Sequence, residues 1–153
     1  MTHALQQQCA AHVQVRVLKE AVGRLLNDEA RLLGTHRSVA HIREVVLEAM
    51  HKPLLAARTV YTRRYAGREK PLATLGTRPL GDLLFARGKP RYLHRQFARL
   101  TARSPITSLV RRATGTACVT SWARRTVFVL DHQRLLVTEI FLPAMFQPRQ
   151  TAQ

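Results

Sequence analysis

Glu139 stands in a segment where an isolated charge is costly. As a strand, RLLVTEIFLP places Glu139 on one face with Leu135, Val137 and Phe141, and the opposite face is apolar apart from a threonine. A carboxylate buried on such a strand must be neutralised, or must find a cation and hydrogen-bond donors. Two interpretations stay open: Glu139 belongs to a structural ion pair, or to a binding site where a carboxyl group handles a proton.

Arg43 and Arg58 raise the same question for a positive charge. If 38–49 is a strand, Arg43 shares a face with Val45 and Leu47, and a guanidinium group buried there needs an anion because it cannot lose its proton. If the segment is a helix, Arg43 lies on its surface. A buried arginine and a buried glutamate on separate strands would form a polar pair inside an apolar pocket, and such a pocket could hold a small anionic ring compound.

Alternating apolar residues predict the strands that must position these side chains. The pattern VQVRV predicts a strand within 13–22. The run SWARRTVFVL, DHQ, RLLVTEIFLP predicts a hairpin with strands near 123–130 and 134–142. Periodicity leaves 38–49 as either a helix or a strand, but the short link HKP into LLAARTVY (54–61) favours a second hairpin.

Short helices and connections account for most of the remaining chain. Thr2 is a suitable N-cap for a helix over 2–10. Two short helical pieces are predicted within 71–85, because Pro71 and Pro79 suit the first turn of a helix and Gly76 suits a helix end. The segment RYLHRQFARL (91–100) fits a further strand. Connections or surface loops are expected at 23–37, 62–70 and 104–117. These elements indicate an α+β fold with a mostly antiparallel sheet.

Length and composition limit the class of protein. A chain of 153 residues with 46% hydrophobic residues suits one folded domain, which we place at 1–153. Cys9 and Cys118 lie far apart and form no disulfide framework, the first residues lack a signal-peptide pattern, and no apolar run is long enough to span a membrane. We therefore expect a cytoplasmic protein without membrane insertion.

Three common sequence signatures of functional sites are missing from the sequence. The histidines show no HExxH or other metal-ligand spacing, GTRPLG lacks the Lys-Ser/Thr of a phosphate-binding loop, and no GxSxG motif occurs. A metal site, a nucleotide-binding loop of this type and a serine hydrolase are therefore not expected.

The strong positive charge points to anionic partners. The formal net charge is +16, and arginines are dense between Arg87 and Arg112, where Tyr92 and Phe97 are interleaved with them. Such a run could bind nucleic acid. Aromatic residues make up only 6% of the chain and no RNA-binding signature is present, so a solvated cationic face is the favoured interpretation.

Three segments resemble the chorismate pyruvate-lyase family. They are IREVVLEAMHKPLLAARTV (42–60), LGTRPLGDLLF (75–85), and WARRTVFVL together with LLVTEIFLP (122–142). The order and most spacings match, and TEIFLP after a W-x-R-R segment is the most specific feature. The similarity covers most of the chain and is weaker over residues 1–37.

The resemblance implies a fold and a reaction. The fold would be an antiparallel sheet with helices packed on it and flap-like helical segments closing a buried pocket. The reaction would be elimination of pyruvate from chorismate without a cofactor, leaving 4-hydroxybenzoate, as the first step of ubiquinone biosynthesis. The implied partners are thus chorismate and 4-hydroxybenzoate, with no metal and no nucleic acid, and we expect a monomer.

The resemblance also implies roles for individual residues. The arginine that holds the ring carboxylate corresponds to Arg43 in IREV, and the pocket leucine of PLG corresponds to Leu80. The glutamate that faces the hydroxyl end of the ring corresponds to Glu139, the candidate acid/base. A methionine that contacts the ligand corresponds to Met1. We add Arg58 as an expected second cation or supporting residue of the pocket.

Two departures from the family accompany these matches. The family has a helical segment before the position of Met1, so the chain is expected to be N-terminally short. The stretch between Leu80 and Glu139 is longer than expected and suggests an arginine-rich insertion around 86–120. Two other functions stay open: an effector-sensing domain of the same fold that binds a small molecule without turning it over, and a basic nucleic-acid-binding protein.

Overall fold

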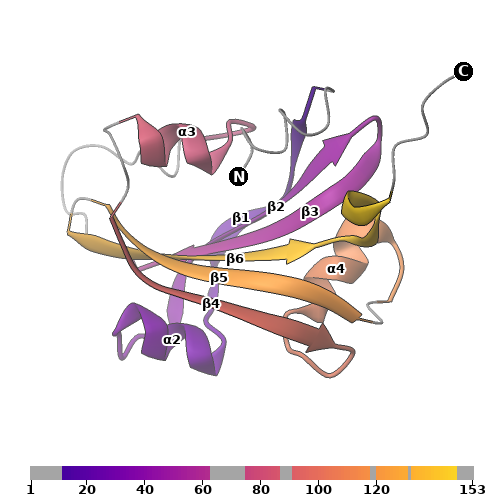
Figure 1. The fold of residues 1–153 in the computed structure, drawn as a ribbon. Coiled ribbons are helices and arrows are strands. Elements are labelled where there is room, and N and C mark those ends of the chain that lie inside the picture. Colours follow the sequence, from indigo (N-terminus) through magenta and orange to yellow (C-terminus); the bar gives the residue numbers. More distant parts are fainter. Residues whose placement is uncertain (1–11, 63–74, 87–90, 118–119, 131, 148–153) are drawn as a thin grey trace, which may run out of the picture.

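A six-stranded sheet forms the centre of the computed structural model, which describes residues 12–62, 75–86, 91–117, 120–130 and 132–147 (Figure 1). The strand order is β1-β2-β3-β6-β5-β4, and all neighbouring strands are antiparallel. The strands are β1 (Gln14–Arg24), β2 (Val39–Ala49), β3 (Lys52–Tyr61), β4 (Arg91–Thr101), β5 (Thr120–Leu130) and β6 (Gln133–Phe141). The predicted α+β class with a mostly antiparallel sheet is confirmed.

Both expected hairpins are present. β5 and β6 form the C-terminal hairpin, and β2 and β3 form the other, so the strand interpretation of 38–49 is correct and the helix interpretation is wrong. Met50 and His51 connect β2 to β3 with φ angles of 51° and 61°. Positive φ at both loop residues gives the connection a twist that matches the strands, as in a type I′ turn.

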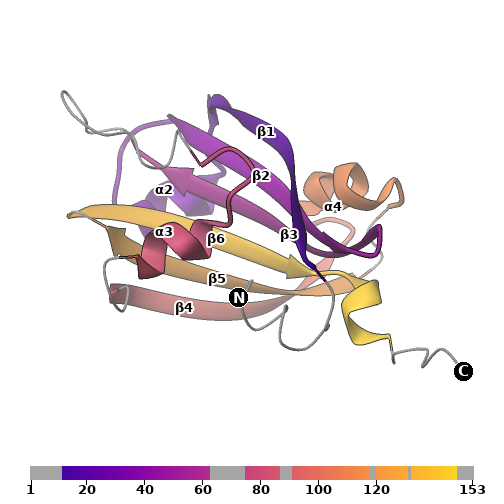
Figure 2. The same ribbon diagram turned by 90° about the horizontal axis from the view of Figure 1, so that it is seen from above.

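The two faces of the sheet carry different helices. Helix α3 (Leu80–Phe85) lies over one face, whereas α2 (Asn27–Leu33) and α4 (Thr107–Thr114) lie under the other (Figure 1). Figure 2 shows α3 above the part of the sheet that β6 and β5 form. A short 3₁₀ helix, η1 (Pro143–Phe146), follows β6.

Two helices were not expected from the sequence. α2 interrupts the supposed connection at 23–37, and α4 interrupts the supposed loop at 104–117. In α4 the apolar side chains of Leu109, Val110 and Ala113 are buried between polar and charged neighbours. With Ile106, they follow the three- and four-residue spacing of a helix face, a signal that the sequence analysis missed. Because so short a helix is marginal alone, its contact with the sheet stabilises it.

Buried side chains pack on both sides of the sheet. On the α4 side, Leu109 and Val110 contact Val46, Ala56 and Ile140. On the α3 side, Leu84 packs against Leu75, Leu135 and Val137. Each strand therefore contributes alternate residues to two different cores, as its two-residue period requires.

Some expected elements lie outside the described residues: the helix over 2–10, nearly all of the loop at 62–70, and most of the first helical piece within 71–85. α3 is the second helical piece. Among the residues that the structure describes, none of the helices has the length and apolarity needed to cross a membrane.

Candidate functional site

A cavity of about 430 Å³ separates α3 from the sheet. Its floor comes from alternate residues of the strands, such as Leu55, Ala57 and Thr59 on β3, and its roof includes Leu80 and Leu84 of α3. Most of the lining is apolar. Four charged side chains of the described residues also line it: Arg43, Arg95, Arg124 and Glu139.

Arg43 extends from β2 into this cavity and is only 3% exposed. Its guanidinium group donates hydrogen bonds to the backbone carbonyl of Gly76, at 2.8 and 3.0 Å, and to that of Arg78, at 3.2 Å. These carbonyls belong to the segment just before α3. The arginine therefore joins the floor of the cavity to its roof.

The charge of Arg43 is only weakly compensated. Burial lowers the pKa of Arg43 below its ordinary value, and the carboxylate of Glu20, with an oxygen 3.9 Å from Nη1, acts in the opposite direction. Backbone carbonyls carry only partial charges, so they do not replace an anionic partner. A buried guanidinium group in this state favours binding of a carboxylate.

Glu139 extends from β6 into the same cavity and pairs with Arg124 of β5. The two residues are directly opposite in the β5–β6 ladder. Nε and Nη2 of Arg124 each lie 2.7 Å from Oε2 of Glu139. Oε1 of Glu139 has no hydrogen bond within the described part of the chain. Glu139 thus pairs with an arginine on a separate strand, as the hypothesis required, but the arginine is Arg124 and its side chain is only partly buried.

Leu80 lies at the first position of α3 and lines the cavity from above. The predicted site residues Arg43, Leu80 and Glu139 thus come from a strand, a helix and a second strand that are far apart in the sequence, and the fold brings them to one cavity. Met1 lies outside the described residues.

Arg58 does not line this cavity, and our assignment of Arg58 to the pocket is corrected. Its side chain extends to the opposite face of the sheet, where Nε lies 2.7 Å from Glu29 and Nη1 lies 2.8 Å from Glu44. Burial acts to lower the pKa of Arg58, but hydrogen bonds and charges from both glutamates outweigh it and raise the pKa. Arg58 therefore belongs to a buried network of ion pairs on the face of the sheet opposite the cavity.

A β-bulge explains this correction. Next to the turn, Ala49 pairs with Lys52 and Glu48 pairs with Pro53, but from Leu47 onward the register is shifted by one residue. Without the shift, Arg43 would be opposite Arg58 and would share its face. With the shift, Arg43 is opposite Thr59, so Arg43 and Arg58 lie on opposite faces of the sheet.

The family model described as chorismate lyase matches residues 1–151 of the chain. The chain belongs to the chorismate lyase family. Its relatives include a protein of Thiobacillus denitrificans named "probable chorismate pyruvate-lyase", 41% identical over 79% of this chain and 66% of the relative. A protein of the same name from Methylococcus capsulatus is 36% identical over 99% of this chain and 94% of the relative.

Several solved structures share the fold, among them proteins described as transcriptional regulators. PhnF from Mycobacterium smegmatis aligns with a TM-score of 0.67 and 14% identity, over 95% of this chain and 64% of that chain. A GntR-family regulator from Bacillus cereus aligns with a TM-score of 0.62 and 9% identity, over 92% of this chain and 99% of the regulator. At such low identities the likeness concerns the chorismate lyase fold and not its use.

Arg124 and Arg95 are residues of this chorismate lyase cavity that the sequence analysis missed. The predicted C-terminal hairpin did not identify Arg124, because a link of three residues, DHQ, pairs Leu130 with Arg134 and places Arg125 opposite Glu139; in the structure the register differs by one residue. Leu130 pairs with Gln133 across the turn, and counting back along both strands from that pair places Arg124 opposite Glu139. No local signal existed for Arg95 either, since β4 is exposed along nearly all its length.

Within the described ranges, no set of three histidine, cysteine, aspartate or glutamate residues is arranged to bind a metal ion. The chemistry that the cavity offers comes from three guanidinium groups, one carboxyl group and an apolar enclosure. This combination can orient an anion and transfer a proton.

Proposed function

We propose that this chain is a chorismate pyruvate-lyase, which converts chorismate to 4-hydroxybenzoate and pyruvate at the start of ubiquinone biosynthesis. The observation that carries the proposal is the presence of Arg43 and Glu139 in one apolar cavity under α3. Membership of the chorismate lyase family and relatives that bear this enzyme's name support the same activity.

Arg43 is proposed to bind the ring carboxylate of chorismate. Its positive charge is buried and only weakly compensated, so an anion that enters the cavity gains a strong electrostatic interaction in an environment that screens poorly. The carbonyls of Gly76 and Arg78 hold the plane of the guanidinium group, so little conformational freedom is lost on binding.

Glu139 is proposed as the acid/base residue. Elimination breaks the bond between a ring carbon and the ether oxygen, and the neighbouring ring carbon loses a proton as the ring becomes aromatic. The released enolpyruvate takes up a proton at its methylene carbon and becomes pyruvate. A carboxylate beside the ring can accept the ring proton, and Arg124 fixes the orientation of the Glu139 carboxylate through Oε2. Aromatisation supplies driving force, so no cofactor enters the reaction.

α3 is proposed as the flap over the bound ring, with Leu80 against the ligand. This helix covers one side of the cavity, and we propose that it moves aside when the product leaves. We therefore expect 4-hydroxybenzoate to be held tightly. Met1 is proposed to complete the ligand contacts.

The proposal has further parts that follow from the sequence. The chain acts as a monomer in the cytoplasm, as a single domain over 1–153 with an arginine-rich insertion around 86–120, and nucleic acid is not its ligand. Its cavity is lined by apolar and aromatic groups suited to one ring compound.

Incubation of the purified chain with chorismate tests the function directly. We expect 4-hydroxybenzoate and pyruvate to appear in equal amounts, as measured by chromatography, and an R43A variant to form them much more slowly. Binding of 4-hydroxybenzoate without any turnover of chorismate would favour the effector-sensing domain. Strongly salt-dependent binding of DNA or RNA, together with no turnover, would favour the nucleic-acid-binding protein.

A further inference from the structure

The charges that line the cavity do not balance without a ligand. Arg124 and Glu139 neutralise each other through their direct ion pair. Arg43 and Arg95 are the remaining charged side chains of the described lining: Arg43 has only the distant carboxylate of Glu20 as an ionic partner, and Arg95, which is exposed to solvent, has no ion pair among the described residues. One carboxylate of a ligand can satisfy only one of them.

The two arginines are at opposite ends of one row across the sheet. Successive pairings of neighbouring strands define this row, which runs through Arg43, Thr59, Val137, Thr126 and Arg95. β2 and β4 are four strand spacings apart, roughly 19 Å in a flat sheet. Both side chains line the cavity, so the two guanidinium groups approach it from its two ends.

The Glu139–Arg124 pair lies between these ends. Glu139 is on β6 and Arg124 on β5, and both strands lie between β2 and β4 in the sheet order. Glu139 is two residues beyond Val137 of the row, about 7 Å along the strand and on the same face. If Arg43 holds the carboxylate at one end of a ring, the carboxyl group of Glu139 lies beside that ring, and Arg95 lies on the far side of Glu139 from Arg43.

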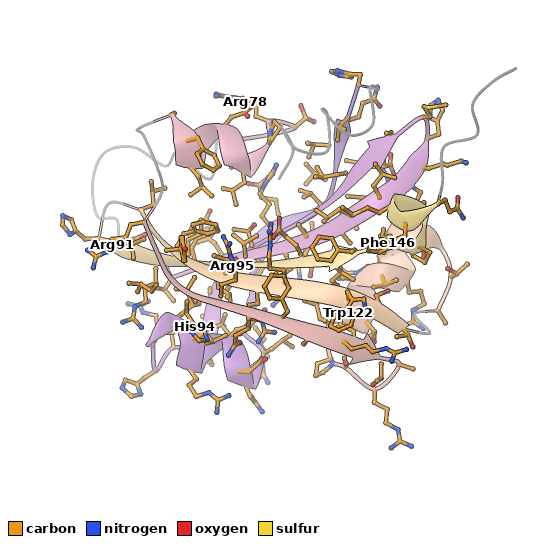
Figure 3. The ribbon with its side chains drawn as sticks, viewed as in Figure 1. Arg78, Arg91, His94, Arg95, Trp122 and Phe146 are labelled. Atoms are coloured by element: carbon orange, nitrogen blue, oxygen red, sulfur yellow. The ribbon has the colours of Figure 1, made fainter. Side chains whose placement is uncertain are left out.

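A second β-bulge directs Arg95 into the cavity. Tyr92 is opposite Phe128 and Arg95 is opposite Thr126, with a register shift between Tyr92 and His94. In a regular strand, residues three apart point to opposite faces, but the extra residue brings Tyr92 and Arg95 to the same face. Figure 3 shows Arg95 on the β4 side of the sheet, beneath α3.

Tyr92 also holds the guanidinium group of Arg95. Cζ of Arg95 lies 4.8 Å from the centre of the Tyr92 ring, which is a cation–π contact. Stacking on a ring face leaves the N–H groups at the edge of the guanidinium plane available. Arg95 has no ion pair with any carboxylate of the described residues.

We propose that Arg95 binds the second carboxylate of the substrate, the one on the enolpyruvyl side chain. The inference rests on the proposed function, since chorismate has two carboxylates and 4-hydroxybenzoate has one. Arg95 then distinguishes substrate from product: it stabilises chorismate and has no partner once pyruvate has left. This is the role of a second cation that the sequence analysis gave to Arg58.

Equilibrium binding of two ligands tests this role without depending on turnover. The probes are 4-hydroxybenzoate, with one carboxylate, and 3-(carboxymethoxy)-4-hydroxybenzoate, which carries a second carboxylate on an ether side chain. We expect R95A to weaken binding of the dicarboxylate about ten- to hundredfold, as for a lost charge-assisted hydrogen bond. Binding of 4-hydroxybenzoate should be unchanged, and the KM for chorismate should rise.

Two further variants make the test decisive. R99A removes an equal charge from β4 at a position that does not line the cavity, and we expect it to bind both probes as the wild type does. R95K keeps the charge and should recover part of the lost affinity. If R95A loses affinity for both probes equally, or if R95K binds the dicarboxylate no better than R95A, the proposal is wrong.

The outcomes also separate this inference from the proposed function. If the wild type releases no 4-hydroxybenzoate from chorismate, the proposed function fails. The binding comparison of R95A with the wild type still tests whether Arg95 binds the second carboxylate. If the wild type is active and R95A keeps the full affinity for the dicarboxylate, only the inference about Arg95 fails.

Discussion

Glu139 and Arg124 are directly opposite each other on β6 and β5, and two nitrogens of Arg124 contact the same carboxylate oxygen of Glu139 at 2.7 Å. This contact orients the one carboxyl group of the described cavity lining. It leaves Oε1 without a hydrogen bond among the described residues. The pair therefore holds a carboxylate in place with one oxygen available to a ligand.

Replacement of Glu139 should slow turnover far more than it alters binding. Glutamine in E139Q has the same shape and can still accept a hydrogen bond from Arg124, but it cannot take up a proton. We expect kcat to fall by about a hundredfold or more. Titration with 4-hydroxybenzoate should show an affinity close to that of the wild type. An unchanged kcat would leave Glu139 with a structural role.

Arg124 should act on catalysis through Glu139. In R124M the carboxylate loses its orienting partner, so we expect a lower kcat/KM. A double-mutant cycle with E139Q measures the coupling, and we expect about 1–3 kcal/mol because the two side chains are in direct contact. Additive effects of the two substitutions would contradict the positioning role of Arg124.

Removal of Arg43 should weaken ligand binding. R43A deletes the weakly compensated cation of the cavity, so the affinity for 4-hydroxybenzoate should fall by about 1.5–3 kcal/mol, the range for a hydrogen bond to a charged group. Calorimetric titration measures this loss, with R99A as a control for the change in overall charge. Equal affinities of R43A and the wild type would remove Arg43 from the site.

Arg58 should matter for stability and not for the ligand. In R58M, Glu29 loses its buried partner and Glu44 retains only the contact with Arg112, so two carboxylates remain under the sheet with too little positive charge. We expect a loss of about 3–5 kcal/mol in the free energy of unfolding. Urea denaturation measures this loss.

R16A is the matched control for this stability test. Arg16 forms an ion pair with Glu48, but its side chain is 45% exposed, so its removal should cost less than about 1 kcal/mol. The affinity of R58M for 4-hydroxybenzoate, measured where the variant is folded, should equal that of the wild type. A selective loss of affinity in R58M would return Arg58 to the binding site.

A stiffer α3 should release product more slowly. Gly81 lies within α3, and a Cβ added there meets no atom within 4 Å, so G81A should stabilise the helix by about 0.5–1 kcal/mol. If opening of α3 limits product release, kcat should fall and inhibition by 4-hydroxybenzoate should strengthen. Stopped-flow dissociation of the product measures the rate.

G34A serves as the contrasting variant. Gly34 ends α2 on the other side of the sheet with φ of 64°, and an added Cβ would lie 2.6 Å from Nη1 of Arg134. G34A should therefore lower stability without changing the release rate. Equal release rates in G81A and the wild type would contradict the role of α3 as the flap.

The local pattern of the chain was enough to identify most of the strands. Alternation of apolar and polar residues indicated β1, because the side-chain period of a strand is visible in a few residues, whereas the hairpin of β2 and β3 was favoured only by its short link. The burial of Glu139 could also be expected from its apolar neighbours, whereas that of Arg43 depended on whether 38–49 formed a strand or a helix. The helical spacing of Leu109, Val110 and Ala113 in α4 was overlooked, whereas α2 has only seven residues and depends on packing against the sheet.

By itself, the sequence determined most of the strands, and it singled out Glu139 and, in the strand interpretation of 38–49, Arg43 as charges that a strand would bury. Tertiary structure decided which charges meet. Two single-residue register shifts, next to Leu47 on β2 and next to Tyr92 on β4, moved Arg58 away from the cavity and turned Arg95 toward it. A bulge changes the face of every residue beyond it, and its position depends on how two distant strands pair, which is not encoded in either strand alone.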